Sequence, residues 1–299
     1  MPRFSKDLSA ETLASSLSCA LDLNEHHLLK KCVFLRPKTI GHMEGVVLFS
    51  PTKRFSLPEK PDEIKTTFVK KFYPGSVESE LIDAVVMGIA KKCGVIVPKV
   101  KLKYTTNHIY FFSTGLGSPN SKHPEKHYEF VKLKELKKRS IILDNQSVAR
   151  FVIISVIFGL FDLVAENMGI RISTKGREEK NKLALVDFLV DMDHRLDIRA
   201  NKQKTFREII KEYSNGRLPA KLVSLSQNYS DDDYFNAFEK IRLNFLGACC
   251  DARRFVNEQP ASVRKKSQTL SLIECWENNF NYFFIKILAS SRPAQNTRR

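Results

Sequence analysis

The sequence predicts an α+β protein of two lobes, because the pattern of its 299 residues changes between the first half and the second. Across residues 39–113, short apolar runs that are typical of strands surround one helical segment. From residue 147 onward, apolar side chains mostly recur every three or four positions, which is typical of amphipathic helices. The length suits about two domains, because a single domain commonly holds about 100–200 residues. We therefore expect an antiparallel sheet with a helix in the first half and an α-rich second half.

The first half opens with an expected amphipathic helix within residues 1–30, where leucines recur at near-helical spacing. A second helix is expected over residues 76–92, because acids occupy its first turns and lysines its last, as the helix dipole favours. Gly94 follows it as a stop signal. The strands expected in this half cover residues 45–50, 65–73, 95–104 and 108–113.

The second half is expected to be helical with one exception, a hairpin of two short β-like runs at residues 168–173 and 182–188. The three aspartates at residues 231–233 are typical of a helix N-terminus, and the aromatic-rich stretch 276–285 is typical of a buried helix face. The expected helices cover residues 147–161, 205–213, 231–257 and 267–290. The predicted organisation is an N-terminal helical extension at 1–30, a first lobe at 31–120, a second lobe at 121–290 and a flexible tail at 291–299.

Composition excludes two classes of protein and favours certain partners. A hydrophobic content of 42% is too high for an intrinsically disordered chain, and the longest apolar stretch, residues 151–164, is too short to cross a membrane and contains Asp162. The formal charge of +16 favours polyanionic partners such as nucleotides, inositol phosphates or an acidic membrane surface. Nucleic acid is not an expected partner, because no base-reading motif is present.

The N-terminal residues lack the basic-then-apolar order of a secretory signal, so we expect a cytosolic folding environment. The six cysteines form no C-x-x-C pair and have no histidines at zinc-ligand spacing, so neither a structural zinc ion nor a disulfide framework is expected.

The hairpin is flanked by oxygen-bearing side chains. Asp162 and Asn167 precede it, and Asp187 follows its second strand. Because the two strands of a hairpin return to the same edge, these three side chains are expected to converge there. Such a cluster, with a lysine from a separate sheet, provides what phosphoryl transfer needs: oxygen ligands for Mg²⁺, a carboxylate near the acceptor hydroxyl and a cation for the phosphates.

These residues resemble motifs of the protein-kinase-like superfamily, and the likeness is to its atypical HipA-like and phosphoinositide-3/4-kinase-like branches. Asp162 to Asn167 keeps the D-x-x-x-x-N spacing of a kinase catalytic loop, and Asp187-Phe188 stands where D-F-G begins. The resemblance implies a bilobal kinase-like fold in which Asp162 orients the acceptor hydroxyl, while Asn167 and Asp187 bind Mg²⁺ or Mn²⁺. The glycine of D-F-G is Leu189 here, and Leu160-Phe161 replaces the histidine and arginine that usually precede the catalytic acid.

The first half contains a strand similar to the V-A-I-K strand of kinases. Val69 and Lys71 match the alanine and lysine of that motif, so the resemblance places Val69 under adenine and Lys71 on the α- and β-phosphates of ATP. Lys70 remains an alternative to Lys71. In a plain structural interpretation, both lysines would protect an exposed strand edge.

The helix and strand that follow carry the remaining matches. Glu80 is expected to hold the lysine, and Glu78 and Asp83 stay open because helical phase cannot be assigned from one sequence. Glu80 also suits an ordinary acid in a first helical turn. Phe112 and Ser113 end the strand that would lead to the adenine-binding hinge, and the turn at residues 41–45 is a weak candidate for the phosphate-covering loop.

Within this superfamily, the basic character and the motif spelling are similar to the secreted effector kinases of Legionella that host inositol hexakisphosphate activates. This resemblance implies an ATP-dependent protein kinase secreted into a host cell cytosol, with an unknown protein substrate and an inositol hexakisphosphate activator. The inositol-phosphate candidates are Arg195, Arg199, Lys202, Lys204 and Arg207. A second basic cluster comprises Lys132, Lys134, Lys137, Lys138 and Arg139.

Other interpretations remain open at this point. The same core could serve a phosphoinositide kinase at an acidic membrane, or a pseudokinase that acts as an inositol-phosphate-binding module. The basic segments also suit a solvated surface, because charge runs usually do, and His194 is interpreted as a surface group. Asp191 and Asp193 stay open as additional metal ligands.

Overall fold

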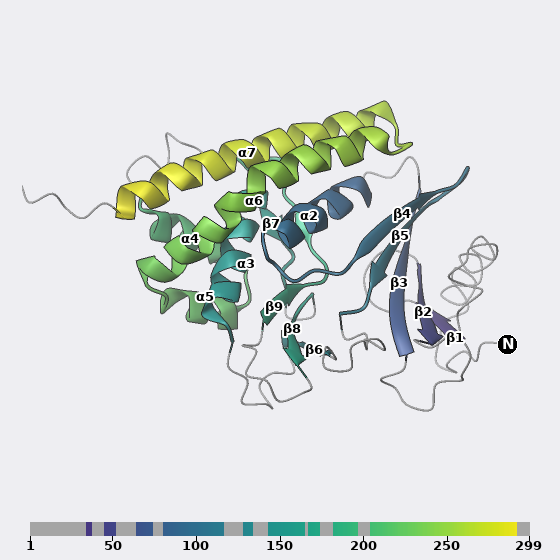
Figure 1. Ribbon diagram of the computed structural model, residues 1–299, viewed down its shortest axis with the longest axis horizontal. Helices are drawn as coiled ribbons and strands as arrows, with labels where there is room; N and C mark the ends of the chain where they lie inside the picture. The colour runs from purple at the N-terminus through teal and green to yellow at the C-terminus, as the bar shows by residue number, and fades with distance from the viewer. Residues whose placement is uncertain are drawn as a thin grey trace, which may run out of the picture. The chain divides into compact units, whose positions relative to one another are not determined.

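The computed structural model divides into two compact units. Figure 1 labels its helices and strands. It describes residues 34–37, 45–51, 64–73, 80–116, 128–133, 143–164, 167–173, 182–196 and 204–291. Unit 1 comprises residues 1–84, 98–130 and 172–179, and unit 2 comprises residues 85–97, 131–171 and 180–299. The chain is a mixed α+β protein with antiparallel sheet in its N-terminal part and helices in its C-terminal part, as the sequence predicts. The expected helix within residues 1–30 lies outside the described residues, as do the turn 41–45 apart from Gly45 and the tail apart from its first residue.

Unit 1 contains a five-stranded sheet in the order β1-β2-β3-β5-β4, and its neighbouring strands are antiparallel. Its strands are β1 (Phe34–Pro37), β2 (Gly45–Pro51), β3 (Ile64–Phe72), β4 (Val100–Tyr104) and β5 (Ile109–Thr114). The strand predictions are confirmed for β2, β3, β4 and β5, whereas β1 was not predicted. β5 is buried at five of its six positions, as expected of an inner strand with both faces covered.

Helix α2 (Glu80–Lys92) confirms the second predicted helix from Glu80 onward, since residues 76–79 lie outside the described part. Its first turn carries Glu80 and Asp83, and its last turn carries two lysines. The helix ends at Lys92, and Gly94 follows it with a φ of 82°, a left-handed conformation that glycine adopts without strain. The sequence signals at both helix ends therefore act as the dipole and capping rules predict.

The paired residues of the predicted hairpin, 168–171 and 182–185, belong to unit 2. β8 (Met168–Ser173) and β9 (Lys182–Leu185) pair antiparallel, with Met168 opposite Leu185. β6 (Tyr128–Lys132), which was not predicted, adds a third strand beside β8. A separate two-stranded pair joins β7 (Leu160–Phe161) to β10 (Leu189–Val190).

The helices of unit 2 pack around α3 (Asn145–Phe158), which is buried at every position from Ser147 to Phe158. A mainly apolar helix that is covered on all sides is expected at the centre of a core. The other helices are α4 (Phe206–Ser214), α5 (Ala220–Gln227), α6 (Asp231–Glu258) and α7 (Val263–Ser291). The predicted helices are confirmed apart from their ends, and α5 was not predicted. The aspartates at 231–233 do begin α6, where Ser230 and Asp233 form a capping box.

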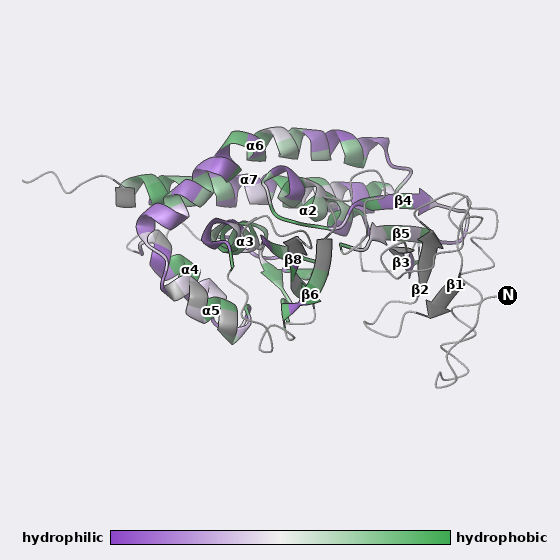
Figure 2. Ribbon diagram, turned by 60° about the horizontal axis from the view of Figure 1, so that its bottom comes forward, coloured by the Kyte–Doolittle hydropathy of each residue, from purple (hydrophilic) through white to green (hydrophobic). Residues whose placement is uncertain are grey.

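The long helices α6 and α7 lie side by side and antiparallel (Figure 1), joined by stacked aromatic rings. Phe245 and Phe280 stack with ring centroids 4.5 Å apart. The rings of Phe158 on α3 and Trp276 also pack together, with centroids 4.7 Å apart. Arg253 also donates to both carboxylate oxygens of Glu277, at 2.5 and 2.6 Å. Figure 2 shows hydrophobic and hydrophilic patches alternating along both helices, as expected of helices with one buried side. The predicted core role of residues 276–285 is confirmed.

Among the described residues, no helix combines the length and the apolar character that a membrane crossing would require.

The four described cysteines are free thiols, and their exposure predicts a difference in reactivity. Burial raises the pKa of Cys93 to about 12 and also raises that of Cys249, whereas Cys250 is exposed. Since the thiolate is the nucleophile, brief alkylation with iodoacetamide at pH 8 should modify Cys250 more than about a hundredfold faster than Cys93 or Cys249. Peptide mapping by mass spectrometry measures this, with denatured protein as the control in which all sites react. Equal rates for Cys93 and Cys250 in the native protein would contradict the packing described here.

Candidate functional site

Asp162 stands at the end of a short path that leads out of the core. Helix α3 stops at Gly159, whose φ of 67° is left-handed, and strand β7 then carries the chain outward. Asp162 itself has a φ of 55°, the only positive value among the described non-glycine residues. Aspartate tolerates this conformation better than most residues, and backbone strain of this kind is often found at functional sites. Asp162 is thereby an exposed residue of unit 2.

Asn167 connects the two aspartates of the predicted cluster. Its side-chain Nδ2 donates to the backbone oxygen of Asp162 at 2.9 Å and lies 3.4 Å from Asp162 Oδ2. Its backbone oxygen accepts from the N–H groups of Val186 at 2.9 Å and Asp187 at 3.3 Å. The structure therefore brings Asp162, Asn167 and Asp187 together within unit 2, as the sequence analysis expects.

Asp187 follows β9 and is half-buried, and its Oδ1 accepts from the N–H of Phe188 at 3.2 Å. The next residues form β10, which pairs with β7 so that Leu189 lies opposite Phe161 and Val190 opposite Leu160. The strand leading to Asp162 is therefore hydrogen-bonded to the strand that leaves Asp187.

The donors in this cluster are a carboxylate and an amide oxygen, from Asp187 and Asn167. These are hard oxygen ligands, which fit Mg²⁺ or Mn²⁺ better than zinc. Within the described residues, no group of three or more histidine, cysteine, aspartate or glutamate side chains is placed to hold a metal ion. One or two protein ligands are nevertheless typical of Mg²⁺ that is also held by substrate phosphates. The residues present fit a metal of that kind.

The predicted lysine and glutamate of unit 1 are both buried, with exposed fractions of 4% for Lys71 and 0% for Glu80. Lys71 Nζ lies 5.5 Å from the ring centroid of Tyr73, and the hydroxyl of Tyr104 donates to Glu80 Oε1 at 3.5 Å. Burial and the carboxylate of Glu80 raise the pKa of Tyr104. Buried charges are costly unless they are compensated, so Glu80 is more than an ordinary surface acid of a first helical turn.

The alternatives to these two residues differ in burial. Lys70 and Asp83 are both partly exposed, and Glu78 lies outside the described residues. β3 lies between β2 and β5, so the interpretation of Lys70 and Lys71 as protectors of an exposed strand edge is wrong. Burial thus favours Lys71 and Glu80 within unit 1.

The remaining ATP candidates of unit 1 lie next to one another in the sheet. Val69 is fully buried on β3 and stands opposite Phe112 of β5, while Ser113 stands opposite Phe68. The exposed fractions of Phe112 and Ser113 are 4% and 8%. Their role at adenine stays a prediction.

Three of the five inositol-phosphate candidates are described, and each bonds to groups of this chain. Arg195 donates to the backbone oxygens of Met192 and His194. Lys204 pairs with Glu212 at 2.5 Å, and Arg207 pairs with Asp231 at 2.5 Å. Ion pairs on an exposed surface are weak, so an anion could compete for these cations. Arg199 and Lys202 lie outside the described residues, as does the second cluster apart from Lys132.

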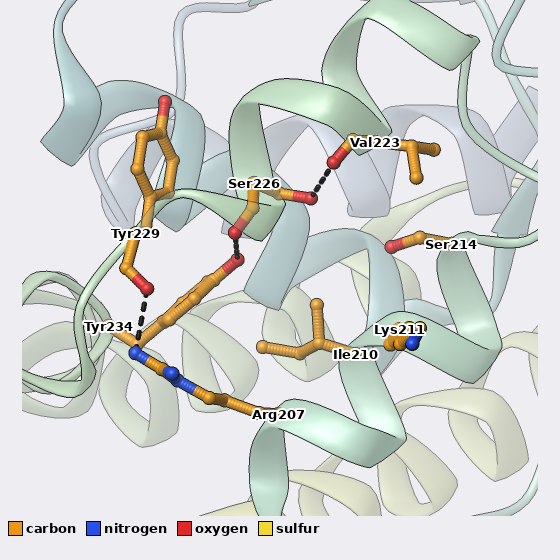
Figure 3. Close-up of a pocket in the computed structure, with 8 residues that line it drawn as sticks. All are labelled: Arg207, Ile210, Lys211, Ser214, Val223, Ser226, Tyr229 and Tyr234. Atoms are coloured by element: carbon orange, nitrogen blue, oxygen red, sulfur yellow. Dashed lines mark hydrogen bonds between the residues drawn. The ribbon is translucent and has the colours of Figure 1, made fainter.

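A cavity of about 330 Å³ lies among α4, α5 and the start of α6, within unit 2 (Figure 3). Its lining residues are Arg207, Ile210, Lys211, Ser214, Val223, Ser226, Tyr229 and Tyr234. Arg207 donates to the backbone oxygen of Tyr229 at 2.7 Å, and Tyr234 donates to that of Ser226 at 3.0 Å (Figure 3). The hydroxyls of Ser214 and Tyr229 are buried and meet no hydrogen-bond partner in the described part of the chain. Since Arg207 is already bound to Asp231 and Tyr229, this cavity does not present it as an unpaired cation.

The interpretation of His194 as a surface group is wrong. The residue is half-buried, its ring Nε2 lies 2.7 Å from the backbone oxygen of Val156, and its ring packs edge-on against Tyr213. Burial lowers the pKa of His194, although its bond to Val156 opposes this effect. The residue in the sequence that could have indicated this close packing is Gly159, because a Cβ added there would lie 2.4 Å from the Cβ of His194. A glycine shows that something approaches closely, but it does not identify the neighbour.

Comparison with known proteins yields structural similarity only. No protein-family model and no curated protein sequence matches the chain. The crystal structure of the proinflammatory kinase CtkA of Helicobacter pylori matches with a TM-score of 0.48 and 11% identity, over 85% of this chain and 95% of CtkA. A HipA, HipB and operator DNA complex from the toxin–antitoxin system of Shewanella oneidensis matches with a TM-score of 0.43 and 10% identity, over 75% of this chain and 59% of the matched chain. Because both TM-scores lie below 0.5, neither match supports a function, which we derive from the chain's own residues.

Proposed function

We propose that this chain is a kinase-like phosphotransferase that moves the γ-phosphoryl group of ATP to a protein hydroxyl. The observation that carries the proposal is the cluster of Asp162, Asn167 and Asp187, which Asn167 joins through its side chain and its backbone. The sequence spacing and the spatial grouping both support the proposal, because phosphoryl transfer needs a carboxylate near the acceptor and oxygen ligands for a metal.

Asp162 is the residue assigned to the acceptor. Its carboxylate is exposed, and the amide of Asn167 lies close enough to restrain it. In the proposed step the acceptor hydroxyl gives its proton to Asp162 while its oxygen forms a bond to the γ-phosphorus. The bond from that phosphorus to the bridging oxygen breaks, and ADP leaves with the electron pair. Asp162 therefore orients the nucleophile and takes up its proton.

Asn167 and Asp187 are the residues assigned to the metal. The side-chain oxygen of Asn167 and the carboxylate of Asp187 would hold Mg²⁺ or Mn²⁺, which when bound neutralises charge on the phosphates. Because the Nδ2 group of Asn167 donates to Asp162, its Oδ1 is the atom left to act as a ligand. One asparagine thus serves both aspartates.

The proposal also assigns residues of unit 1 to ATP. Lys71 would bind the phosphates with Glu80 as its partner, and Val69, Phe112 and Ser113 would lie near adenine. These assignments rest on the motif resemblance, and the burial of Lys71 and Glu80 supports them. The proposals of an inositol hexakisphosphate activator and of secretion as an effector rest on the same resemblance alone, and none of the contacts described above supports them further.

Transfer of label from [γ-³²P]ATP, with Mg²⁺ and myelin basic protein as the acceptor, tests the proposal. Asp162→Asn should lower the initial rate by about 10²–10⁴-fold, because it removes the base and little else. The matched control is Asp251→Asn, an exposed aspartate of the same unit. An Asp162→Asn variant with the wild-type rate would remove the assignment.

Two further arms separate the alternatives. Label that enters phosphatidylinositol vesicles and not protein would identify a lipid kinase. Parallel reactions with and without inositol hexakisphosphate test the activator. If ATP is bound but not consumed in any arm, the pseudokinase interpretation replaces this one.

A further inference from the structure

The C-terminal end of α3 is bound by groups from elsewhere in unit 2. The last carbonyl groups of a helix lack regular partners within it. Here the cap N–H of Gly159 bonds to Ser155 O and Val156 O, and this end leads directly to Asp162. His194 Nε2 donates to Val156 O at 2.7 Å, and Asn279 Nδ2 donates to Ile157 O at 2.9 Å. The N–H of Asp191 donates to Gly159 O at 3.0 Å, and the hydroxyl of Tyr213 donates to Leu160 O. The path from α3 to Asp162 is therefore fixed by tertiary hydrogen bonds.

Two of these donors, Asp191 and His194, belong to the segment that follows Asp187. The backbone N–H of His194 also bonds to the backbone oxygen of Asp191 at 3.2 Å, which closes a turn between them. The segment that begins at Asp187 is consequently attached to α3 at two points beyond the pairing of β10 with β7. A shift of this segment would move Asp187 relative to Asp162.

The contact between His194 and α3 is close because residue 159 has no side chain. A Cβ at Gly159 would lie 2.4 Å from the Cβ of His194, so the histidine packs directly against the backbone at the helix end. Tyr213 packs edge-on against the imidazole, with ring centroids 5.6 Å apart. Cys275 Sγ lies 3.2 Å from the backbone oxygen of His194. The end of α3 and Tyr213 thus restrict the ring, and Cys275 restrains the backbone of His194.

The carboxylate of Asp191 takes part in this turn. Its Oδ2 accepts from Arg217 at 3.1 Å, and its Oδ1 accepts from the N–H of Asp193 at 3.2 Å. Arg217 in turn lies over the ring of Tyr213, at 5.0 Å from its centroid. These bonds hold the turn that presents His194 to Val156.

We propose that His194 is a positioning residue, which anchors the segment after Asp187 to the end of α3 and so keeps Asp187 aligned with Asp162. It acts through these two aspartates and touches neither ATP nor the acceptor. This inference rests on the proposed function, since alignment matters for transfer only if both aspartates serve it.

Substitutions at position 194 of the full chain separate the hydrogen bond from simple packing. His194→Gln places an amide nitrogen near the position of Nε2, so it can still donate to Val156. His194→Asn also introduces a polar side chain, but its amide nitrogen lies near the position of Nδ1, so the side chain is too short to reach Val156 O. His194→Leu retains much of the volume and has no donor.

The leucine and asparagine variants should lose about 10–100-fold in kcat for transfer, because a misplacement of about 1 Å can cost 100-fold. The KM for ATP should change by less than about threefold. The glutamine variant should recover most of the rate, which a merely structural role would not produce. Met192→Ala, at an exposed residue of the same segment, is the control and should keep the wild-type rate. Wild-type kcat in His194→Asn, or no recovery in folded His194→Gln, would overturn the inference.

Amide hydrogen exchange supplies a readout that needs no catalysis. In His194→Asn, the N–H of Asp191 should exchange at least about tenfold faster than in the wild type, because its bond to Gly159 loses its neighbouring anchor. Unchanged exchange there would also overturn the inference. If the wild type transfers no phosphate while exchange responds as expected, the proposed function fails and the structural coupling through His194 stands.

Discussion

Asp187→Asn is expected to lower the rate of phosphoryl transfer by about 10²–10³-fold, the loss typical of removing one group that stabilises charge in a transition state. Asparagine has the same shape and retains an Oδ1 that accepts from the N–H of Phe188, so the local fold should persist. It lacks the negative charge that a carboxylate offers a divalent cation. Mg²⁺-dependent binding of ATP should therefore weaken along with the rate. Calorimetric titration with ATP, in Mg²⁺ and then in EDTA, measures the binding.

Two comparisons make this result specific. Asp251→Asn removes a charge at an exposed position of α6 and should leave both binding and rate unchanged. Asp162→Asn should lose the rate but keep Mg²⁺-dependent ATP binding, because the proposal assigns that residue to the acceptor. If Asp187→Asn binds ATP with the same Mg²⁺ dependence as the wild type, Asp187 is not the metal ligand.

Phe245→Ala should lower the free energy of unfolding by about 3–5 kcal/mol, the usual cost of removing a buried phenylalanine side chain. Phe245 is fully buried on α6, stacks on Phe280 of α7 and lies 6.1 Å from Phe158 of α3, as measured between ring centroids. Its loss leaves a cavity where three helices meet. Urea unfolding followed by fluorescence measures the change, since the one tryptophan of the chain, Trp276, lies in the same unit.

Leu243→Ala is the matched control, because Leu243 lies on the same helix and is 75% exposed. Its effect should stay within about 0.5 kcal/mol, as is usual for surface substitutions. A similar loss in both variants would contradict the stabilising role of the aromatic contact, because alanine is the strongest helix former and neither substitution lowers helix propensity.

The regular elements were predictable where one physical signal dominated. The alternation of β3 and the charged ends of α2 are local properties, and both elements lie where expected. β6 was not predicted because it lies in a basic, polar stretch whose charges obscure its alternation. The predicted helix over residues 147–161 extended too far, since the apolar run continues into β7 and only Gly159 marks the end of α3.

The candidate site was predictable as a set of residues but not as a set of contacts. The spacing of Asp162, Asn167 and Asp187 identified the three side chains and the hairpin that groups them. The two hydrogen bonds that the backbone oxygen of Asn167 accepts cannot be predicted from residue types, because every residue has such an oxygen. His194 was misjudged for a related reason, since its partner is a carbonyl group at a helix end that no side-chain pattern reveals.

The left-handed backbone of Asp162 affects how any replacement there is understood. Alanine or valine would remove the carboxylate and also introduce a residue that resists this conformation, so two causes would be mixed in one loss of activity. Asparagine and glycine adopt it more readily, and they isolate the chemistry of the missing charge from the distortion of the chain.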